Sequence, residues 1–506
     1  MSDAPSPPDA VAGRRRRRLE VAAVFVGVAI VYLIAPATGI SDSNYTMLFA
    51  HQLWSKGTLD VREHVPERAF TLGGGRFPGP YLHRYPYHLR IVGEGGKPRR
   101  RGRPWSLLPT FPVGSPLLGV PFAAAADLAG RPVVDPELGG YRIERDRQLQ
   151  YTAAALFTAA FVAAAFAALR RGVDRGPALA ASLCLAFGSM AWSTASKALW
   201  SQTSCLFLAG LALPGIVRIA RGEPARAEAV GALLAGAWIC RPTAALMVAA
   251  VGVWILARDR RAALRFGAGA AAVALPFVAW SMARFGAPMP PYYSAGRLGD
   301  GFSFESIYGS LLAANRGLLV YLPVVGVLVA AALARRARSH DGGLAVLALA
   351  GLGAHWLTVV SFRHWWGGYS FGPRLFTDAL FWIVLLAAAV LPWIAGAEPA
   401  VRRWRRALVA TAAVGVVIHA GGALSHQGML WNARPIPVDR APERIWDWRD
   451  PQWLAFANRE PRRIVMPEPV EIDSGDAKQV PKRARPDRER RRQRRQRRPV
   501  EPRPAG

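Results

Sequence analysis

The sequence predicts an all-α integral membrane protein, a bundle of helices with apolar surfaces. The chain is 52% hydrophobic and only 19% charged over its 506 residues. The apolar residues fall into long runs of Ala, Val, Leu, Gly and Phe, and short arginine-rich patches separate these runs. The length of the runs matches the hydrocarbon core of a bilayer, which is roughly 30 Å thick and is crossed by about 20 helical residues.

Eleven runs are expected to span the membrane. The first of them follows a basic stretch, as a signal peptide does, but no small-residue cleavage site ends it, so we expect a retained helix. The predicted spans are 19–40, 151–169, 177–194, 199–219, 226–241, 243–258, 262–283, 317–334, 343–362, 375–396 and 404–424.

Arginine clusters orient these helices, because basic residues collect on the cytoplasmic side of a membrane. Arg14–Arg18 precede the first span and predict a cytoplasmic N-terminus in a plasma membrane protein. Two assignments of spans place the later arginine clusters on the cytoplasmic side as well. The segment 107–129, interrupted by prolines, is expected at the interface and not across the membrane, and Arg241-Pro242 is expected to divide 226–258 into two short spans. The odd number of spans then leaves the C-terminus outside.

The chain is thereby divided into parts of different composition. The predicted parts are a basic N-terminus (1–18), a transmembrane domain (19–424) with an outer loop at 41–150, an outer extension (425–465) and a disordered arginine-rich tail (466–506). The net charge of +30 would suit nucleic acid, but the tail has no aromatic residue on which bases could stack. We therefore expect no nucleic-acid partner.

Several polar residues at the predicted outer surface could carry chemistry. Asp42 follows the first span, and its carboxylate could act as a general base or cap a helix at 43–55. Lys197 lies between two spans, where it could contact a phosphate or extend to the interface among tryptophans. Arg241 is expected to have a partner carboxylate or to face a wet cavity, because an intramembrane charge is costly.

A dense outer cluster, RHWWGGYSFGPR, runs from Arg363 to Arg374. Its aromatic residues suit the aromatic belt of a membrane protein or the faces of sugar rings, and arginine can bind phosphate through two hydrogen bonds. The belt does not account for the glycines. Arg374 and Asp378 are four residues apart, which favours an ion pair on one helix face.

In this order, the features resemble the GT-C superfamily of membrane glycosyltransferases that use polyprenyl-phosphate sugars. The similar members are the aminoarabinose transferases of lipid A, the protein O-mannosyltransferases and the membrane glycosyltransferases of rhizobial lipopolysaccharide core. The resemblance covers roughly 19–455. It is carried by the acidic residue after the first span, FPVGSPLL at 111–118, WWGGYSFGPR at 365–374 and WDWRDPQ at 446–452.

The resemblance implies a bundle of about eleven helices whose large outer first loop carries juxtamembrane helices. It implies transfer of a hexose or pentose from a polyprenyl-phosphate donor to an envelope glycan, lipid or protein acceptor outside the cytoplasm. Asp42 occupies the place of the family's first-loop aspartate and would be the base. The protein mannosyltransferases have a glutamate next to it, which this chain lacks, so Asp60 and Glu63 remain alternatives.

The resemblance also assigns roles to the other outer residues. The donor phosphate would be held by Arg374, Arg316, Lys197 and Arg241, and the sugar or acceptor would contact Trp365, Trp366, Tyr369 and Tyr45. No cofactor and no metal are expected, because the histidines of the first outer loop lack a ligand spacing.

Two other classes of function compete with this one. A non-enzymatic flippase or transporter of lipid-linked glycan would favour charged residues at mid-membrane depth and internal repeats. A scaffold for envelope assembly would explain the tail but not the outer cluster. The chain has no P-loop sequence, so a cytoplasmic nucleotide site is not expected.

Overall fold

The computed structural model describes most of the chain between Pro7 and Ala457. The described residues are 7–37, 39, 42–64, 89–93, 105–135, 137, 140–293, 301–335 and 343–457. The chain forms two units, Met1–Arg462 and Arg463–Gly506, and every described residue belongs to the first. The arginine-rich tail predicted at 466–506 lies outside the described residues.

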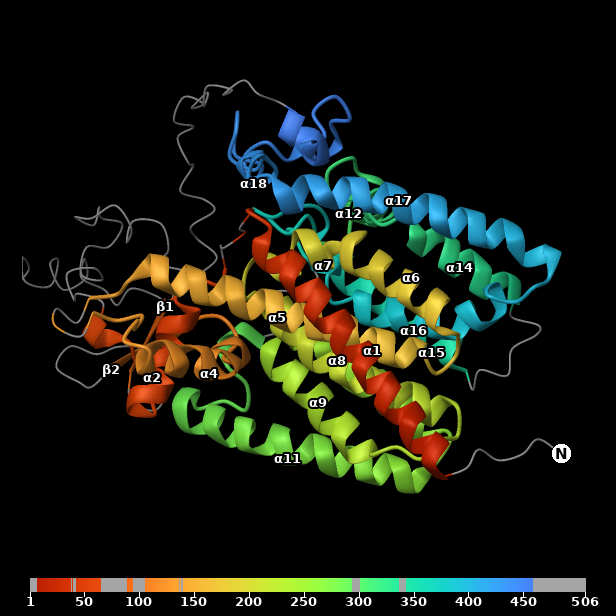
Figure 1. The fold of residues 1–506 in the computed structure, drawn as a ribbon. Helices are drawn as coiled ribbons and strands as arrows, with labels where there is room; N and C mark the ends of the chain where they lie inside the picture. The colour runs from red at the N-terminus through yellow and green to blue at the C-terminus, as the bar shows by residue number, and fades with distance from the viewer. Residues whose placement is uncertain are drawn as a thin grey trace, which may run out of the picture. The chain divides into compact units, whose positions relative to one another are not determined.

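The described chain is mostly helical, and each of the eleven predicted spans coincides with a helix or a pair of helices (Figure 1). The largest difference is in α1, which extends back through the first arginine cluster and ends six residues before the predicted position 40. The helices that coincide with the spans are α1 (Pro7–Ile34), α5 (Ile143–Leu169), α6 (Arg175–Phe187), α7 (Met190–Ser193), α8 (Ser201–Ala220), α9 (Ala227–Cys240), α10 (Ala245–Leu256), α11 (Arg260–Phe285), α13 (Leu318–Tyr321), α14 (Val324–Arg335), α15 (Leu344–Val360), α16 (Leu380–Ile394) and α17 (Arg402–Leu424).

Several of these helices could cross a membrane. Within the described residues, five segments are long and apolar enough to do so, and five shorter apolar helices accompany them. The apolar surfaces of α11 and α17 face outward, since only 17% and 33% of their most apolar stretches are buried inside the protein. Leu264 of α11 is 75% exposed and Val409 of α17 is 71% exposed. Helices that expose so much apolar surface need an apolar surrounding.

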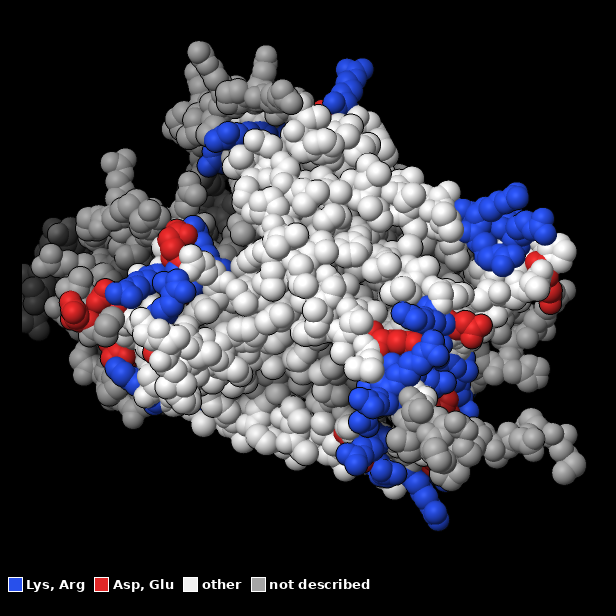
Figure 2. Space-filling view, in the orientation of Figure 1, with Lys and Arg blue, Asp and Glu red and all other residues white. Residues whose placement is uncertain are grey.

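Ion pairs join several helix ends at one end of the bundle, which we name the arginine-rich end. Glu20 of α1 lies 3.4 Å from Arg170 at the end of α5 and 3.8 Å from Arg175 at the start of α6. Arg171 lies 2.5 Å from Glu223, which follows α8. Figure 2 shows charged side chains gathered at the two ends of one face, with a belt of uncharged residues between them.

Helices α9 and α10 form a hairpin that starts and finishes at the arginine-rich end. Glu228 in the first turn of α9 lies 2.8 Å from Arg265 near the start of α11, so α9 and α11 begin at the same end. The chain turns at Arg241, whose backbone is extended because Pro242 follows it. The predicted division of 226–258 into two helices is therefore confirmed.

The segment between α1 and α5, predicted as the first outer loop, folds in its described part into a small subdomain that contains a two-stranded sheet, which the all-α prediction did not include. Its strands are antiparallel, with Leu89 opposite Pro109, and α2 packs against α4. The segment 107–129 is divided between strand and helix, and the 15 residues of α4 span only about 22 Å, less than a bilayer core. The elements are α2 (Thr46–Lys56), β1 (Leu89–Gly93), β2 (Trp105–Pro109) and α4 (Gly114–Leu128).

The chain after α17 forms an extension that packs on the bundle. It contains α18 (Gln427–Leu430) and two 3-10 helices, Pro442–Trp446 and Gln452–Ala457. The second 3-10 helix contacts both α17 and α18, and α18 lies near the end of α17 that is far from its arginines (Figure 1). The outer extension predicted at 425–465 is thus folded over its described part, up to residue 457.

Candidate functional site

A cavity of about 850 Å³ lies at the end of the bundle opposite the arginine-rich end. Its wall includes Ser201 at the start of α8 and Arg241 at the turn of the α9–α10 hairpin, and the other ends of these helices lie at the arginine-rich end. Residues of the first outer loop, of the segment after α11 and of the segment 358–375 also line the cavity. Its ionisable side chains from Asp, Arg and His are Asp42, Arg241, Arg363, His364, Arg374 and Asp439.

Asp42 and Arg374 form an ion pair in the wall of this cavity. An Nη atom of Arg374 donates to Asp42 at 2.7 Å, and the other Nη donates to the Gly367 carbonyl at 2.9 Å. The guanidinium also lies 4.4 Å from the centre of the Trp200 ring, a cation–π contact. Its buried Nε has no hydrogen-bond partner within the described part of the chain.

The expected pairing of Arg374 with Asp378 is wrong. Arg374–Phe376 is one turn of 3-10 helix and α16 begins only at Leu380, so the two residues do not share a helix face. Asp378 pairs instead with Arg241, and Thr243 donates to the same carboxylate oxygen at 3.1 Å. The partner carboxylate that Arg241 was expected to need is therefore Asp378, and this arginine also faces the cavity.

The glycines of the 363–374 cluster have a conformational reason. Gly367 and Gly368 have φ of +77° and +62°, a region that side chains with a Cβ rarely adopt. This backbone directs the Gly367 carbonyl to Arg374, and the Gly368 carbonyl accepts from Arg316 at 3.2 Å. At Gly372 (φ +60°), a Cβ would lie 2.6 Å from the ring of Tyr321. The glycines thus place the loop that carries Arg374.

Arg316 lies outside the cavity wall and connects loops. All five of its N–H donors are used, and each acceptor is a backbone carbonyl or a side-chain amide oxygen. It is only 1% exposed, and burial lowers its pKa to about 10, so the guanidinium stays charged at neutral pH. With no free donor, it has nothing left to offer a phosphate. The acceptors are the carbonyls of Asn315, Trp366 and Gly368 and the side chains of Asn432 and Gln452.

Lys197 is buried beside the cavity and is not part of its wall. The side chain is 1% exposed and its Nζ has no hydrogen-bond partner among the described residues. The Nζ atom lies over the ring of Tyr151, 5.7 Å from its centre. Burial without a partner lowers the pKa of Lys197 to about 7. The residue therefore neither extends to an interface nor contacts the cavity.

Among the aromatic residues predicted to contact a sugar or acceptor, none is part of the cavity wall itself. Trp365 is buried in a small apolar cluster under the extension. Trp366 donates its indole N–H to Asp439 at 2.8 Å, and Tyr369 is 36% exposed. Tyr45 is buried and packs against Tyr141 with ring centres 5.2 Å apart.

Asp42 does not cap the helix that follows it. Helix α2 begins at Thr46, and its first free N–H groups, those of Met47 and Leu48, both donate to Asp146 at 3.2 Å. A carboxylate at a helix N-terminus is favourable because of these donors and the helix dipole. Sequence reasoning missed Asp146, which lies about 100 residues away on α5 and has no local signal of this role.

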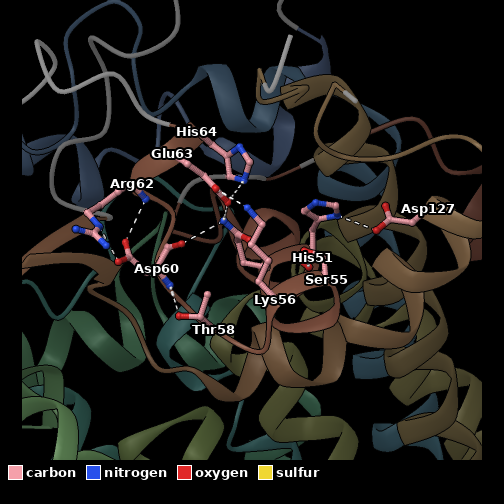
Figure 3. A network of polar contacts seen from close by, with 10 residues as sticks. His51, Ser55, Lys56, Thr58, Asp60, Arg62, Glu63, His64 and Asp127 are labelled. Atoms are coloured by element: carbon pink, nitrogen blue, oxygen red, sulfur yellow. Dashed lines mark hydrogen bonds and ion pairs between the residues drawn. The ribbon is translucent and has the colours of Figure 1, made fainter. Parts of the chain in front are cut away.

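The alternative bases Asp60 and Glu63 lie in a separate polar network on the first outer loop (Figure 3). Asp60 accepts from the backbone N–H of Leu107 at 2.9 Å and pairs with Arg62 at 2.7 Å. Glu63 pairs with Lys56, whose hydrogen bond is the main cause that lowers the pKa of this carboxyl. Neither lies in the cavity wall, so both serve the fold of the loop.

Two further residues were missed. Gln452 is 1% exposed and accepts from Arg316 at 2.6 Å and from the backbone of Gly372 at 2.9 Å, while its amide donates to the Ser370 carbonyl at 2.8 Å. The WDWRDPQ motif ends at this residue, but nothing in the motif indicates its partners. Asp439 reaches the cavity from the extension.

The segment 368–372 also contains a G-x-S-x-G pattern, which sequence analysis overlooked. In serine hydrolases this pattern forms a strand-to-helix turn with an exposed serine hydroxyl. Here Ser370 is buried in a loop, and its hydroxyl donates to the Gly367 carbonyl at 3.5 Å. The segment therefore does not present a nucleophile.

No protein-family model, no curated protein and no solved structure matches this chain. Among the described residues, no group of three or more His, Cys, Asp or Glu side chains could hold a metal ion.

Proposed function

We propose that this protein is an integral membrane glycosyltransferase. It would move a sugar from a polyprenyl-phosphate donor to an envelope acceptor on the extracytoplasmic face, as the resemblance to the GT-C superfamily suggests. The observation that supports this most is the Asp42–Arg374 pair in a cavity that also contains Arg241 and Arg363. A carboxylate paired with an arginine, with further cations nearby, suits a reaction that needs a base and a departing phosphate.

Insertion in a membrane is supported by the outward-facing apolar surface of α11 and α17. In this proposal all eleven segments lie in the bilayer, with the arginine-rich end in the cytoplasm. Helices α9 and α10 have only 14 and 12 residues, about 21 and 18 Å, so the cavity would occupy the outer part of the membrane above their turn. A reporter fused after Asp450 should be active only outside the cytoplasm, and cytoplasmic activity would overturn this orientation.

In the proposed reaction the acceptor hydroxyl attacks the anomeric carbon of the donor sugar. Asp42 takes the hydroxyl proton, the new C–O bond forms, and the bond from the anomeric carbon to the phosphate oxygen breaks with its electron pair leaving on the phosphate. Arg374 and Arg241 stabilise the polyprenyl phosphate that departs. Displacement from one face would invert the configuration at the anomeric carbon.

The Asp42–Arg374 pair also suggests an order of binding. While Arg374 donates to the carboxylate, one oxygen of Asp42 is engaged in that hydrogen bond. A donor phosphate competes for the same guanidinium and would release Asp42. Asp42 would therefore be free to take the acceptor proton only after the donor has bound, which would disfavour proton abstraction in an empty site.

A flippase or transporter of lipid-linked glycan is the second candidate, and one observation favours it. The buried Arg241–Asp378 pair lies deep between helices, where transporters place charged residues. Arg241 of this pair lies in the wall of the cavity that also holds Asp42, which suits a transferase equally well. Sugar transfer to an acceptor separates the two candidates.

The test is a transfer assay with full-length protein in membranes or nanodiscs. Radiolabelled polyprenyl-phosphate sugars are supplied together with envelope fractions as acceptors, and the label is followed from donor to acceptor. Transfer by the wild type, absent in membranes that lack the protein, is the expected result. Movement of the labelled donor across liposomes without any transfer would support the flippase and overturn the transferase.

A further inference from the structure

The mouth of the cavity has a carboxylate that the reaction above does not use. Asp439 comes from the extension after α17, and its side chain accepts the indole N–H of Trp366 at 2.8 Å through one oxygen. The residue is exposed and lies in the cavity wall. The other oxygen lies beside Gly368, 3.9 Å from the position that a Cβ on this glycine would take.

Aromatic rings surround this carboxylate. The ring of His364, which also lies in the cavity wall, is 4.9 Å from that of Trp366. Tyr369 is 36% exposed. Tyr369 directly follows Gly368, beside which the Asp439 carboxylate lies, and burial and then the charge of Asp439 raise the pKa of Tyr369.

The backbone beneath these rings is held in place. The Trp366 carbonyl accepts from Nε of Arg316 at 2.9 Å, and the Gly368 carbonyl accepts from its Nη at 3.2 Å. Arg316 is itself buried and fully bonded. A site whose groups are already ordered loses less entropy when a ligand binds.

We propose that Asp439, Trp366, His364 and Tyr369 form a subsite for a carbohydrate acceptor. This inference rests on the proposed function and selects a glycan among its acceptors. Neighbouring hydroxyls of one sugar can both donate to a carboxylate, and hydrogen bonds to a charged group are stronger than neutral ones. The aromatic rings offer apolar faces to the C–H face of a sugar. Because the C-terminal extension supplies Asp439, this extension would take part in binding the acceptor.

The experiment measures binding of oligosaccharides to full-length protein in nanodiscs. The probes are a panel of hexopyranose and pentofuranose oligosaccharides, with a serine- and threonine-containing peptide for comparison. We expect the wild type to bind at least one oligosaccharide, and Asp439→Asn to weaken that binding by about tenfold or more. Asparagine can still accept the Trp366 N–H, so the variant should keep its fold.

Glu305→Gln is the matched control. Glu305 also accepts an indole N–H, that of Trp446 at 3.3 Å, but it lies outside the cavity wall, so this variant should bind within about twofold of the wild type. Binding of undecaprenyl phosphate should be the same in Asp439→Asn as in the wild type.

Three outcomes would overturn the subsite: no oligosaccharide binds the wild type, Asp439→Asn binds as tightly as the wild type, or only the peptide binds. If undecaprenyl phosphate does not bind the wild type while oligosaccharides bind in an Asp439-dependent way, the proposed transferase fails and the subsite stands.

Discussion

Asp42 and Arg374 are separated by 332 residues in the sequence, and their side chains form an ion pair at 2.7 Å. The pair joins the segment after α1 to the loop before α16. The Asp42 side chain is 32% exposed while that of Arg374 is 10% exposed, so a ligand in the cavity can reach the carboxylate directly. Solvent on that side also screens the attraction, which leaves the pair open to competition by a phosphate.

Replacing Asp42 by asparagine keeps the shape of the side chain and removes the base. We expect Asp42→Asn to lower sugar transfer by at least about 100-fold, within the usual contribution of a general base, while donor binding is retained. Transfer rate and donor affinity should be measured separately with the same purified protein. Asp60→Asn is the matched control, because Asp60 belongs to the same loop but not to the cavity wall. Normal transfer by Asp42→Asn would show that another group is the base.

Replacing Arg374 should affect both binding and rate. Arg374→Ala removes the guanidinium, and we expect donor affinity to fall by about tenfold or more, as for loss of a charged hydrogen bond. Arg374→Lys keeps a charge but cannot bind phosphate through two parallel hydrogen bonds, so it should be intermediate. Protein level and melting temperature of each variant give the control for folding. Unchanged donor affinity in Arg374→Ala would exclude its phosphate-binding role.

The buried Arg241–Asp378 pair should be most sensitive to loss of one partner. Asp378→Asn leaves Arg241 buried and uncompensated, and we expect it to lower the free energy of unfolding by about 3–5 kcal/mol. The double variant Arg241→Met with Asp378→Leu removes both charges and should recover part of this loss. Thermal unfolding in detergent measures both variants. A double variant less stable than Asp378→Asn alone would contradict the pairing.

Lys197 should make stability depend on pH. Its pKa in the folded protein is about 7, against an ordinary value of 10.5. Between these values the unfolded chain binds more protons than the folded one, so the free energy of unfolding rises with pH across that window. Lys197→Met lacks this titrating group. The difference by which its free energy of unfolding exceeds that of the wild type should be largest near pH 7 and shrink toward pH 10. If the melting temperatures of the two proteins change with pH in the same way, Lys197 does not have a lowered pKa.

The extension should be essential and the tail dispensable. A stop codon after Val465 removes the arginine-rich tail, and we expect folding and transfer to be unchanged because the tail lacks apolar periodicity. Gln452→Ala leaves Arg316 and the Gly372 N–H without their buried acceptor, and should lower stability by about 2–4 kcal/mol. Thermal unfolding and transfer should be compared for both proteins. Loss of transfer in the truncated protein would show that the tail has a role in the site.

The sequence by itself determined where the helices lie. Run length and the spacing of arginine clusters are local properties, so they located the long apolar segments of the bundle and the break at Arg241. The reason for that break is steric and involves only the next residue, Pro242. The sequence also showed that Gly367 and Gly368 are unusual. It did not show why they are needed, which is that a positive φ directs their two carbonyls to arginines.

Only the tertiary structure decided which charges meet. The sequence favoured Asp378 as the partner of Arg374 because the two are four residues apart. In the folded protein Asp378 pairs with Arg241, and Arg374 pairs with Asp42. Ion pairs and hydrogen bonds act over a few ångströms, and a separation of hundreds of residues carries no information about such distances. For the same reason Arg316 resembled a phosphate ligand in sequence but is fully bonded to loops, while Asp439 enters the cavity from an extension that no local pattern connects to it.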